Sequence, residues 1–154
     1  MTAATSHEPA AGPREGGWCY SSLLLLTDED LRCVYPDDLP AARQKYPGGW
    51  QLQCFQYAGR QGGYHVLDDG ELRMRVREAI IQPIPAPRFR RGDRVFAYPK
   101  QVVGVVRQVS WHLKRGQVYY SLIFGTQPSG RWYFESDLDS PSSAEPVAAP
   151  DPAT

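Results

Sequence analysis

The segment 92–138 constrains the fold of this 154-residue chain more than any other part. It contains runs in which apolar and polar residues alternate, and glycine, proline and polar residues separate these runs. The two-residue period of a half-buried strand occurs in residues 94–98, 118–124 and 131–135, and residues 102–109 are rich in the β-branched side chains that strands favour. Several strands this short, so close together in the sequence, are typical of a small antiparallel β-barrel.

The residues between these runs indicate where the strands end or bend. Pro99 has no amide hydrogen to donate, so it belongs at a strand end or at a sheet edge. Residues 112–116 and 125–130 are rich in polar residues, glycine and proline, and they predict turns. Gly104 lies inside the second run and indicates a bulge or a sharp bend.

Three short motifs of this segment resemble parts of the SH3-like small barrels. Gly92–Val95 opens the first strand, Gly104–Val106 lies within the second, and Tyr133–Glu135 precedes Asp137–Leu138 at the end. Tudor, Agenet and KOW-type domains share this fold. The resemblance implies a binding module rather than one particular function, because the fold supports many unrelated functions.

An earlier part of the chain has the same order of runs and turns. Leu31–Pro36 resembles Arg94–Pro99, since each is a short run that ends in Tyr-Pro. The later matches pair residues 50–55, 64–67 and 72–77 with residues 105–110, 119–123 and 131–135. Asp68–Gly70 is a hairpin signal, because glycine readily adopts positive φ. We interpret this pattern as a tandem repeat of about fifty residues.

Residues 37–49 interrupt the first repeat and have only a short counterpart in the second. Pro40 to Tyr46 can form a short helix with proline in its first turn. The insertion is either a binding loop or a plain surface loop. Upstream, Trp18–Leu26 is apolar enough for an ordered strand or a strap across the core, and Thr27 either caps a helix or lies in a turn.

Together these features predict an all-β, mainly antiparallel fold. Two small SH3-like barrels lie in tandem and pack together, because barrels of this size are marginally stable alone. The predicted divisions are a disordered tail at 1–17, a first barrel-like unit at 18–82, a proline-rich linker at 83–91, an SH3-like barrel at 92–138 and a disordered acidic tail at 139–154.

The formal net charge of zero conceals a strongly basic centre. Residues 71–131 contain twelve bases and three acids, whereas residues 1–70 and 132–154 are both acidic overall. Such asymmetry indicates either an anionic partner or acidic ends that fold back and screen the centre.

The sequence offers little for catalysis or for a metal. Its three cysteines have no paired spacing, which argues against a disulfide framework and a zinc site: Cys19, Cys33 and Cys54. No motif for nucleophilic, phosphate or metalloprotease chemistry occurs. Cys54 paired with His65 or His112 is less favoured than Cys54 as a buried thiol. We therefore expect no enzyme activity, no cofactor and no metal. The apolar run 23–26 is too short to span a bilayer, so we expect a cytoplasmic protein without a membrane partner.

Two binding hypotheses follow. The first is a protein partner held by aromatic side chains of the second barrel, for which the candidates are Tyr98, Trp111, Tyr119 and Trp132. Trp111 and Tyr119 are expected to be exposed. For Trp132 and Phe134 the alternation favours a shared core face.

The alternative is single-stranded RNA or DNA bound by the basic centre. Phosphates require a row of cations, and bases require aromatic rings on which to stack. The candidate cations are Arg73, Arg75, Arg77, Arg88, Arg90, Arg91, Lys114 and Arg115. The competing interpretation is that Arg73, Arg75 and Arg77 form ion pairs with nearby acids.

Overall fold

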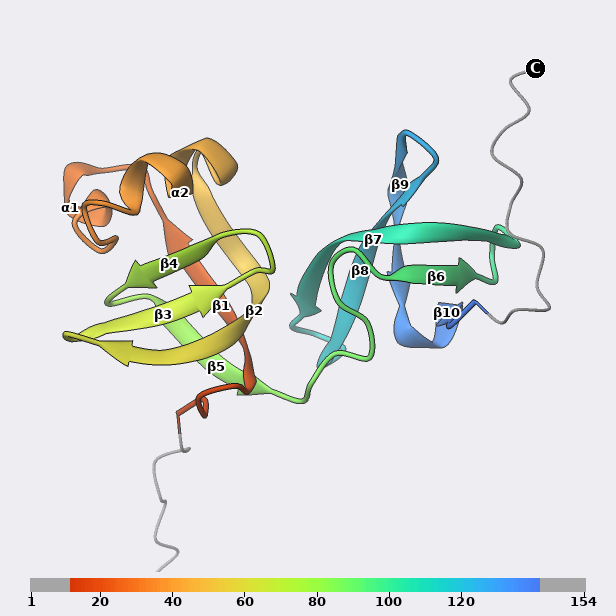
Figure 1. Cartoon of the computed structure of the whole chain (residues 1–154), viewed down its shortest axis with the longest axis horizontal. Coiled ribbons are helices and arrows are strands. Elements are labelled where there is room, and N and C mark those ends of the chain that lie inside the picture. Colours follow the sequence, from red (N-terminus) through yellow and green to blue (C-terminus); the bar gives the residue numbers. More distant parts are fainter. Residues whose placement is uncertain (1–11, 142–154) are drawn as a thin grey trace, which may run out of the picture.

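The structure, a computed structural model, describes residues 12–141 and consists mainly of antiparallel β-strands (Figure 1). The first half contains β1 (Trp18–Leu24), α1 (Asp28–Leu31), α2 (Leu39–Lys45), β2 (Gly49–Gln61), β3 (Tyr64–Asp68), β4 (Arg73–Val76) and β5 (Ile80–Ile84). The second half contains β6 (Arg94–Ala97), β7 (Val102–His112), β8 (Gln117–Phe124), β9 (Gln127–Phe134), the 3-10 helix η1 (Glu135–Asp137) and β10 (Leu138–Asp139). The prediction of a mainly antiparallel β fold is confirmed.

The strands of the two halves have the same spatial order. Pairing gives β5-β1-β2-β3-β4 in the first half and β10-β6-β7-β8-β9 in the second. β2 also pairs with β7, at Gln53 and Ser110, so all ten strands belong to one connected open sheet. Two separately closed barrels do not follow from this pairing, and the tandem SH3-like barrels stay a hypothesis.

Each half has a hydrophobic core, and alternation along the strands determines which residues enter it. In β8 the fully buried Tyr120 and Leu122 alternate with partly exposed residues, as expected when one face of a strand is covered. Tyr133 of β9 joins them in the second core. Phe55 and Met74 lie in the first core.

The predicted strand at Leu31–Pro36 is wrong. Thr27 caps α1: its hydroxyl accepts a hydrogen bond from the Asp30 backbone N–H, and the Asp30 carboxylate accepts from the Thr27 N–H. This capping box begins a short helix, and only Val34 then makes an isolated bridge, to Val76. The first strand of this half is instead β1, while the predicted helix in the insertion is present as α2.

Three further predictions differ from the structure. Pro83 and Ile84 belong to β5 and not to a linker; β5 lies at the end of the strand order, where a residue without an N–H is tolerated. The turn predicted at 125–130 is shorter, because Gly125 has a φ of 63° and β9 already begins at Gln127. The irregularity of β7 lies between Val106 and Gln108.

Gly104 has a different role from the predicted bulge. It is buried, and a Cβ atom there would lie 2.9 Å from Cε1 of Phe124. The position therefore needs glycine because the neighbouring ring approaches closely.

The ends of the predicted units also shift. Gly16 donates a backbone hydrogen bond to Tyr57, Tyr57 donates one to Gly17, and Asp139 belongs to β10. Residues 1–11 and 142–154, which carry most of the two predicted tails, lie outside the described residues. Between residues 12 and 141, no helix has the length and apolar character required to cross a membrane.

Candidate functional site

A cluster of rings lies on the outer side of the second half, and we call it the aromatic face: the exposed Trp132 and the partly buried His112, Tyr119 and Phe134. Pairing explains why they meet. Tyr119 lies opposite Phe134, and Ser121 lies opposite Trp132. Directly paired residues in an antiparallel sheet project from the same face, so alternation that buries Tyr120 and Tyr133 turns these rings outward.

Trp132 is the most exposed ring of the aromatic face. It is 58% exposed, and its ring centroid lies 4.8 Å from that of Tyr119 with an interplanar angle of 34°. The ring of His112 lies 5.6 Å from Phe134 and 6.0 Å from Tyr119. The interpretation of Trp132 and Phe134 as core residues is therefore wrong: they do share a face, but the core lies on the other side, with Tyr133.

Cations lie beside this face, and so does one carboxylate, because that of Asp137 accepts from the Phe134 backbone N–H at 3.0 Å. The turn between β7 and β8 carries the exposed Lys114 and Arg115. The Arg115 guanidinium lies 4.3 Å from the Phe134 ring centroid, and its backbone N–H donates to Nδ1 of His112 at 3.1 Å. The whole stretch 94–134 contains six bases and no acid. The strands that carry the rings therefore supply positive charge, and the acids Glu135 and Asp137 begin only after Phe134.

The other two predicted aromatic residues lie elsewhere. Trp111 alternates onto the opposite side of β7, where it is partly buried against the second core and stacks on Tyr20 at 5.7 Å and 8°. Tyr98 follows β6, and its hydroxyl donates to the Asp139 carboxylate at 2.8 Å. Of the four candidates, the structure brings only Tyr119 and Trp132 together.

Three candidate arginines lie on or directly after β4, and we call them the arginine stripe of β4: Arg73, Arg75 and Arg77. Most of their contacts are with acids, a ring and a backbone oxygen of the protein itself. Arg75 makes a two-pronged ion pair with Asp38 of the insertion and covers the Tyr35 ring at 3.6 Å. That guanidinium, through its hydrogen bonds, holds the pKa of Asp38 below its usual range, against the effect of burial. Arg73 pairs with Asp68 at 3.3 Å. Arg77 donates to the backbone oxygen of Arg32, at 3.2 Å.

The other three candidate arginines, Arg88, Arg90 and Arg91, also contact groups of the protein itself. Arg88 pairs with Asp139 at 2.6 Å, and Arg91 pairs with Glu71 at 2.9 Å. Arg90 lies 5.8 Å from the Trp18 ring. Arg115 is therefore the candidate cation that contacts the aromatic face, and Lys114 is its exposed neighbour in the same turn.

The histidine and cysteine candidates do not form a catalytic pair. Cys54 is 3% exposed, and burial raises the pKa of its thiol, which disfavours a reactive thiolate. His65 Nδ1 lies 2.7 Å from the Tyr57 hydroxyl. Burial, and then the charge of Arg60, lower the pKa of His65. Within residues 12–141 no group of three or more metal-ligating side chains occurs.

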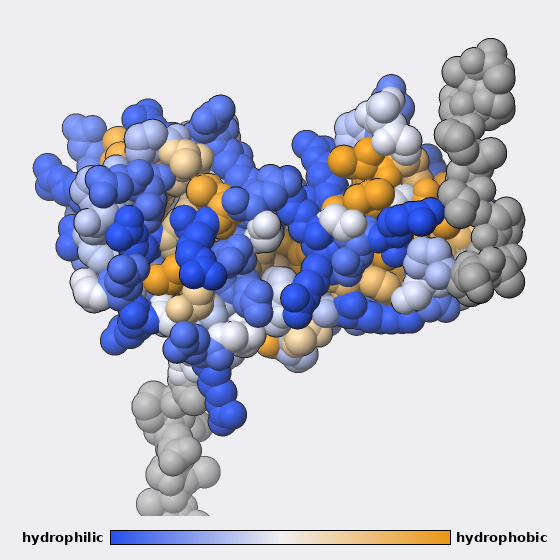
Figure 2. All heavy atoms as spheres, viewed as in Figure 1, coloured by the Kyte–Doolittle hydropathy of each residue, from blue (hydrophilic) through white to orange (hydrophobic). Residues whose placement is uncertain are grey.

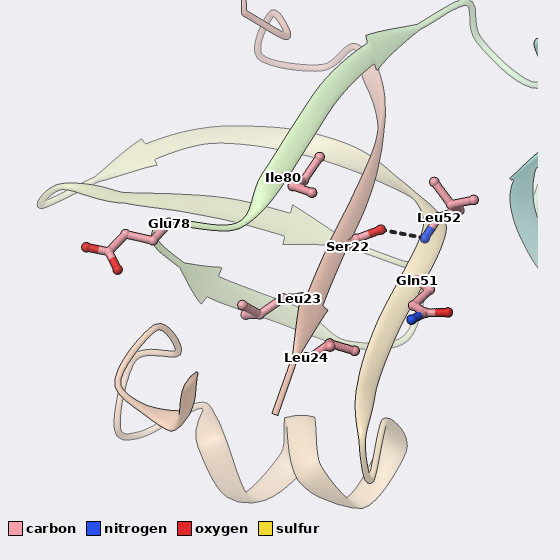
Figure 3. Close-up of a pocket in the computed structure, with 7 residues that line it drawn as sticks. All are labelled: Ser22, Leu23, Leu24, Gln51, Leu52, Glu78 and Ile80. Carbon is pink, nitrogen blue, oxygen red and sulfur yellow. Dashed lines mark hydrogen bonds between the residues drawn. The ribbon is translucent and has the colours of Figure 1, made fainter. Parts of the chain in front are cut away.

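A second surface feature is a shallow apolar groove of about 440 Å³ beside β1, β2 and β5 (Figure 3). It is lined by Ser22, Leu23, Leu24, Gln51, Leu52, Glu78 and Ile80. Leu52 and Glu78 have φ angles of 51° and 58°, which are uncommon for residues other than glycine. Leu24 and Ile80 are largely exposed. Sequence reasoning missed this groove, because no local motif marks it.

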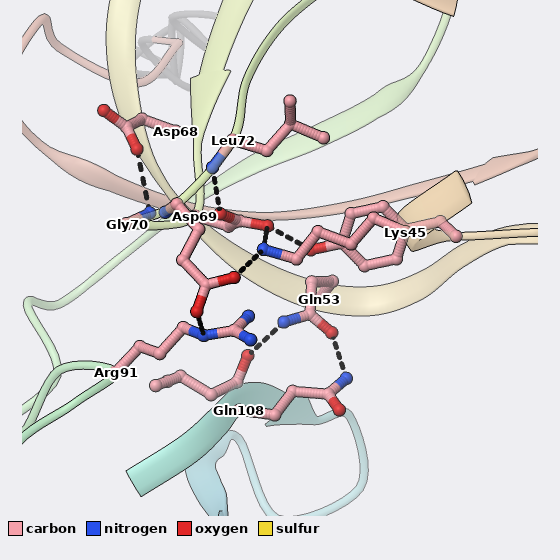
Figure 4. Close-up of polar contacts among 11 residues, drawn as sticks. Lys45, Gln53, Asp68, Asp69, Gly70, Leu72, Arg91 and Gln108 are labelled. Atoms are coloured by element: carbon pink, nitrogen blue, oxygen red, sulfur yellow. Dashed lines mark hydrogen bonds and ion pairs between the residues drawn. The ribbon is translucent and has the colours of Figure 1, made fainter. Parts of the chain in front are cut away.

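Polar contacts join the insertion, the β3–β4 turn and the second half (Figure 4). Lys45 of α2 pairs with Asp69 and with Glu71, and Glu71 pairs with Arg91. The Gln108 side chain donates to the Gln53 amide oxygen, and the Gln53 amide donates to the backbone oxygen of Val109. These contacts hold the two halves in contact, and we call them the polar bridge.

The fold and the site define a class of protein: an all-β chain of two packed antiparallel halves that presents exposed rings in a cationic setting. This chain belongs to a family of unknown function, DUF6960, whose family model matches residues 19–139. The match begins in β1 and ends in β10, so it covers both halves. No curated protein and no solved structure matches the chain.

Proposed function

We propose that this protein is a non-enzymatic binding module that holds an anionic macromolecule on its aromatic face. The carrying observation is the exposure of Trp132, which packs against Tyr119, in a stretch that has no carboxylate. Exposed aromatic side chains supply contact area with little loss of conformational entropy on binding. An exposed apolar cluster on a soluble surface usually marks an interaction site.

The charge around the face defines the kind of partner. A cationic ligand, of the type that aromatic cages hold, would be repelled by Lys114 and Arg115 and would find no acid in residues 94–134. An anionic partner is attracted by the same groups. Another protein with an acidic segment and a single-stranded nucleic acid both meet this requirement.

Two broader parts of the proposal rest on other observations. The two halves have the same strand order, which supports a tandem repeat of small β units. The SH3-like identity of these units rests on the resemblance of the sequence motifs. A cytoplasmic setting is supported by the cysteines, because Cys19, Cys33 and Cys54 are all buried free thiols and reducing compartments keep thiols in this form.

Capture from a clarified lysate tests the use of the aromatic face. We expect the parent protein to retain a partner that Trp132→Ala loses. Leu26→Ala, which alters a similarly exposed apolar side chain in the first half, should retain it. Equal capture by all three proteins would contradict the proposal. Each capture is repeated after nuclease treatment, which separates a protein partner from one held through nucleic acid.

A further inference from the structure

We infer that the partner of the aromatic face is single-stranded nucleic acid, whose unpaired bases stack on Trp132 and its neighbours while Lys114 and Arg115 contact phosphates. This inference rests on the proposed function and adds the identity of the partner. It also moves the predicted nucleic-acid site from the arginine stripe of β4 to the hairpins of β7, β8 and β9.

The rings have the arrangement that base stacking needs. A base is planar, and it stacks on an aromatic side chain whatever its identity. Trp132 keeps 58% of its surface open, while Tyr119 supports it from one side at 4.8 Å. Phe134 and His112 extend the ring surface toward the β7–β8 turn. The face therefore offers several adjoining rings to successive bases.

The cations lie at the end of this ring surface, where a phosphate backbone can pass. The Arg115 guanidinium covers Phe134, and its backbone N–H donates to His112. Both contacts orient the turn. Lys114, the neighbouring residue, is exposed. Cations next to stacking rings form the combination that sequence-tolerant single-strand sites use.

Other partners fit less well. A duplex keeps its bases stacked internally, so it offers no unpaired base to the exposed Trp132 ring. An acidic peptide satisfies the charge, but its carboxylates provide no planar surface for the exposed Trp132 ring.

The stripe of β4 is the less suitable cation row. Asp38 already holds the Arg75 guanidinium through two side-chain hydrogen bonds, and Asp68 holds Arg73. A phosphate would have to displace these partners, whereas Lys114 and Arg115 form no ion pair with an acid among the described residues.

Fluorescence anisotropy of a labelled, mixed-sequence RNA 12-mer and of its DNA equivalent tests the inference on the full chain. We expect Trp132→Ala to weaken binding about tenfold or more, because one stacking ring is lost. Replacing Lys114 and Arg115 by serine should weaken binding and flatten its salt dependence. For about two phosphate contacts the affinity should fall roughly sevenfold between ~50 and ~200 mM salt.

Matched controls separate this site from general charge attraction. Trp132→Phe keeps a ring and should restore part of the affinity. Arg73→Ser with Arg75→Ser removes a similar charge from β4 and should bind like the parent once circular dichroism shows a folded protein. A duplex of the same sequence should bind more weakly than either single strand.

Each outcome has a defined meaning. Absence of binding by the parent at ~50 mM salt overturns the inference. Binding that ignores Trp132→Ala, or that only the β4 substitutions abolish, also overturns it. If lysate capture still depends on Trp132 and survives nuclease, while the oligonucleotides fail to bind, the proposed function stands and the partner is an acidic protein. If neither capture nor oligonucleotide binding depends on Trp132, both proposals fail.

Discussion

The two buried tyrosines of the second core differ in what their hydroxyl groups contact. The Tyr120 hydroxyl donates to the Glu135 carboxylate at 2.9 Å and accepts from the Phe89 backbone N–H at 3.3 Å. The Tyr133 hydroxyl is buried and has no hydrogen-bond partner among residues 12–141. An unsatisfied buried polar group reduces stability, whereas a paired one contributes to it.

This contrast predicts opposite effects of the same substitution. Tyr120→Phe should lower the free energy of unfolding by about 1–2 kcal/mol, because it leaves Glu135 and the Phe89 N–H without a partner. Tyr133→Phe should leave stability unchanged or raise it. Urea unfolding followed by circular dichroism measures both. A loss of stability in Tyr133→Phe equal to that in Tyr120→Phe would show that the Tyr133 hydroxyl has a stabilising partner.

The sequence correctly predicted which residues share a strand face, but it did not predict which of the two faces points to the core. Alternation correctly placed Trp132 with Phe134 and opposite Tyr133. It could not say which face is the core, because both sets are aromatic. The available signal was the stretch 94–134, which has six bases and no acid, because cations near rings are typical of a surface and not of a core. Phe134, His112 and the contact of Arg115 with the ring needed the strand register.

At the scale of elements, the β3–β4 turn depends on one buried carboxylate. Asp69 accepts from Lys45 and from the Tyr46 hydroxyl, and it also accepts from the backbone N–H groups of Glu71 and Leu72. Burial by itself would raise the pKa of Asp69, but these donors outweigh it and hold the pKa below its usual range. The turn thus anchors α2 through a charge.

The lowered pKa predicts where stability depends on pH. A carboxylate with a depressed folded-state pKa stabilises the fold above its unfolded pKa of about 4, and this contribution is lost as the pH falls through the folded value. Asp69→Asn should therefore cost about 2–3 kcal/mol at neutral pH and progressively less in acid. Urea unfolding at several pH values measures the difference. Asp37→Asn, which changes an exposed acid of the insertion that contains α2, should show little effect. A cost for Asp69→Asn that is equal at all pH values would contradict this account.

Elements were predicted best where turn chemistry and period agreed. The strands 118–124 and 64–67 and the helix at Pro40–Tyr46 are present with small shifts of their ends. Leu31–Pro36 failed because the capping box of Thr27 and Asp30 favours helix over a run that reads as a strand. The β5 strand was missed because Pro83 suggests a linker, whereas an edge strand accepts proline.

At the scale of the whole molecule, β1 and β2 belong to both halves. Cys19 and Phe55 enter the first core, while Trp18, Tyr20 and Cys54 pack against the second. β1 therefore contributes side chains from both of its faces to a core, although Trp18 and Tyr20 are only partly buried. In Figures 1 and 2 the halves lie side by side, and hydrophobic atoms gather over the second half while hydrophilic atoms cover most of the first. The strand faces that meet could not be predicted from the sequence, because they depend on how the two halves are arranged in space.

The stacked pair of Tyr20 and Trp111 predicts what joins the two halves. Trp111→Ala removes a ring that lies 5.7 Å from Tyr20 and is partly buried against the second core. We expect a loss of about 2 kcal/mol or more, because a large side chain is truncated at a packed contact. The other contacts between the halves, among them the polar bridge and the packing of Trp18 and Cys54, remain but are weaker in total. The halves should therefore unfold at different urea concentrations, so that far-ultraviolet and near-ultraviolet circular dichroism give separate transitions.

Trp132→Ala is the matched control, because it removes the same side chain from an exposed position. It should change stability by less than about 0.5 kcal/mol and retain a single transition, while losing the partner. Trp111→Ala should retain the partner wherever the second half remains folded. The opposite result, in which Trp132→Ala separates the transitions and Trp111→Ala abolishes binding, would exchange the roles of the two tryptophans. It would place the contact surface of this family on the side of the sheet that we assign to the contact between the halves.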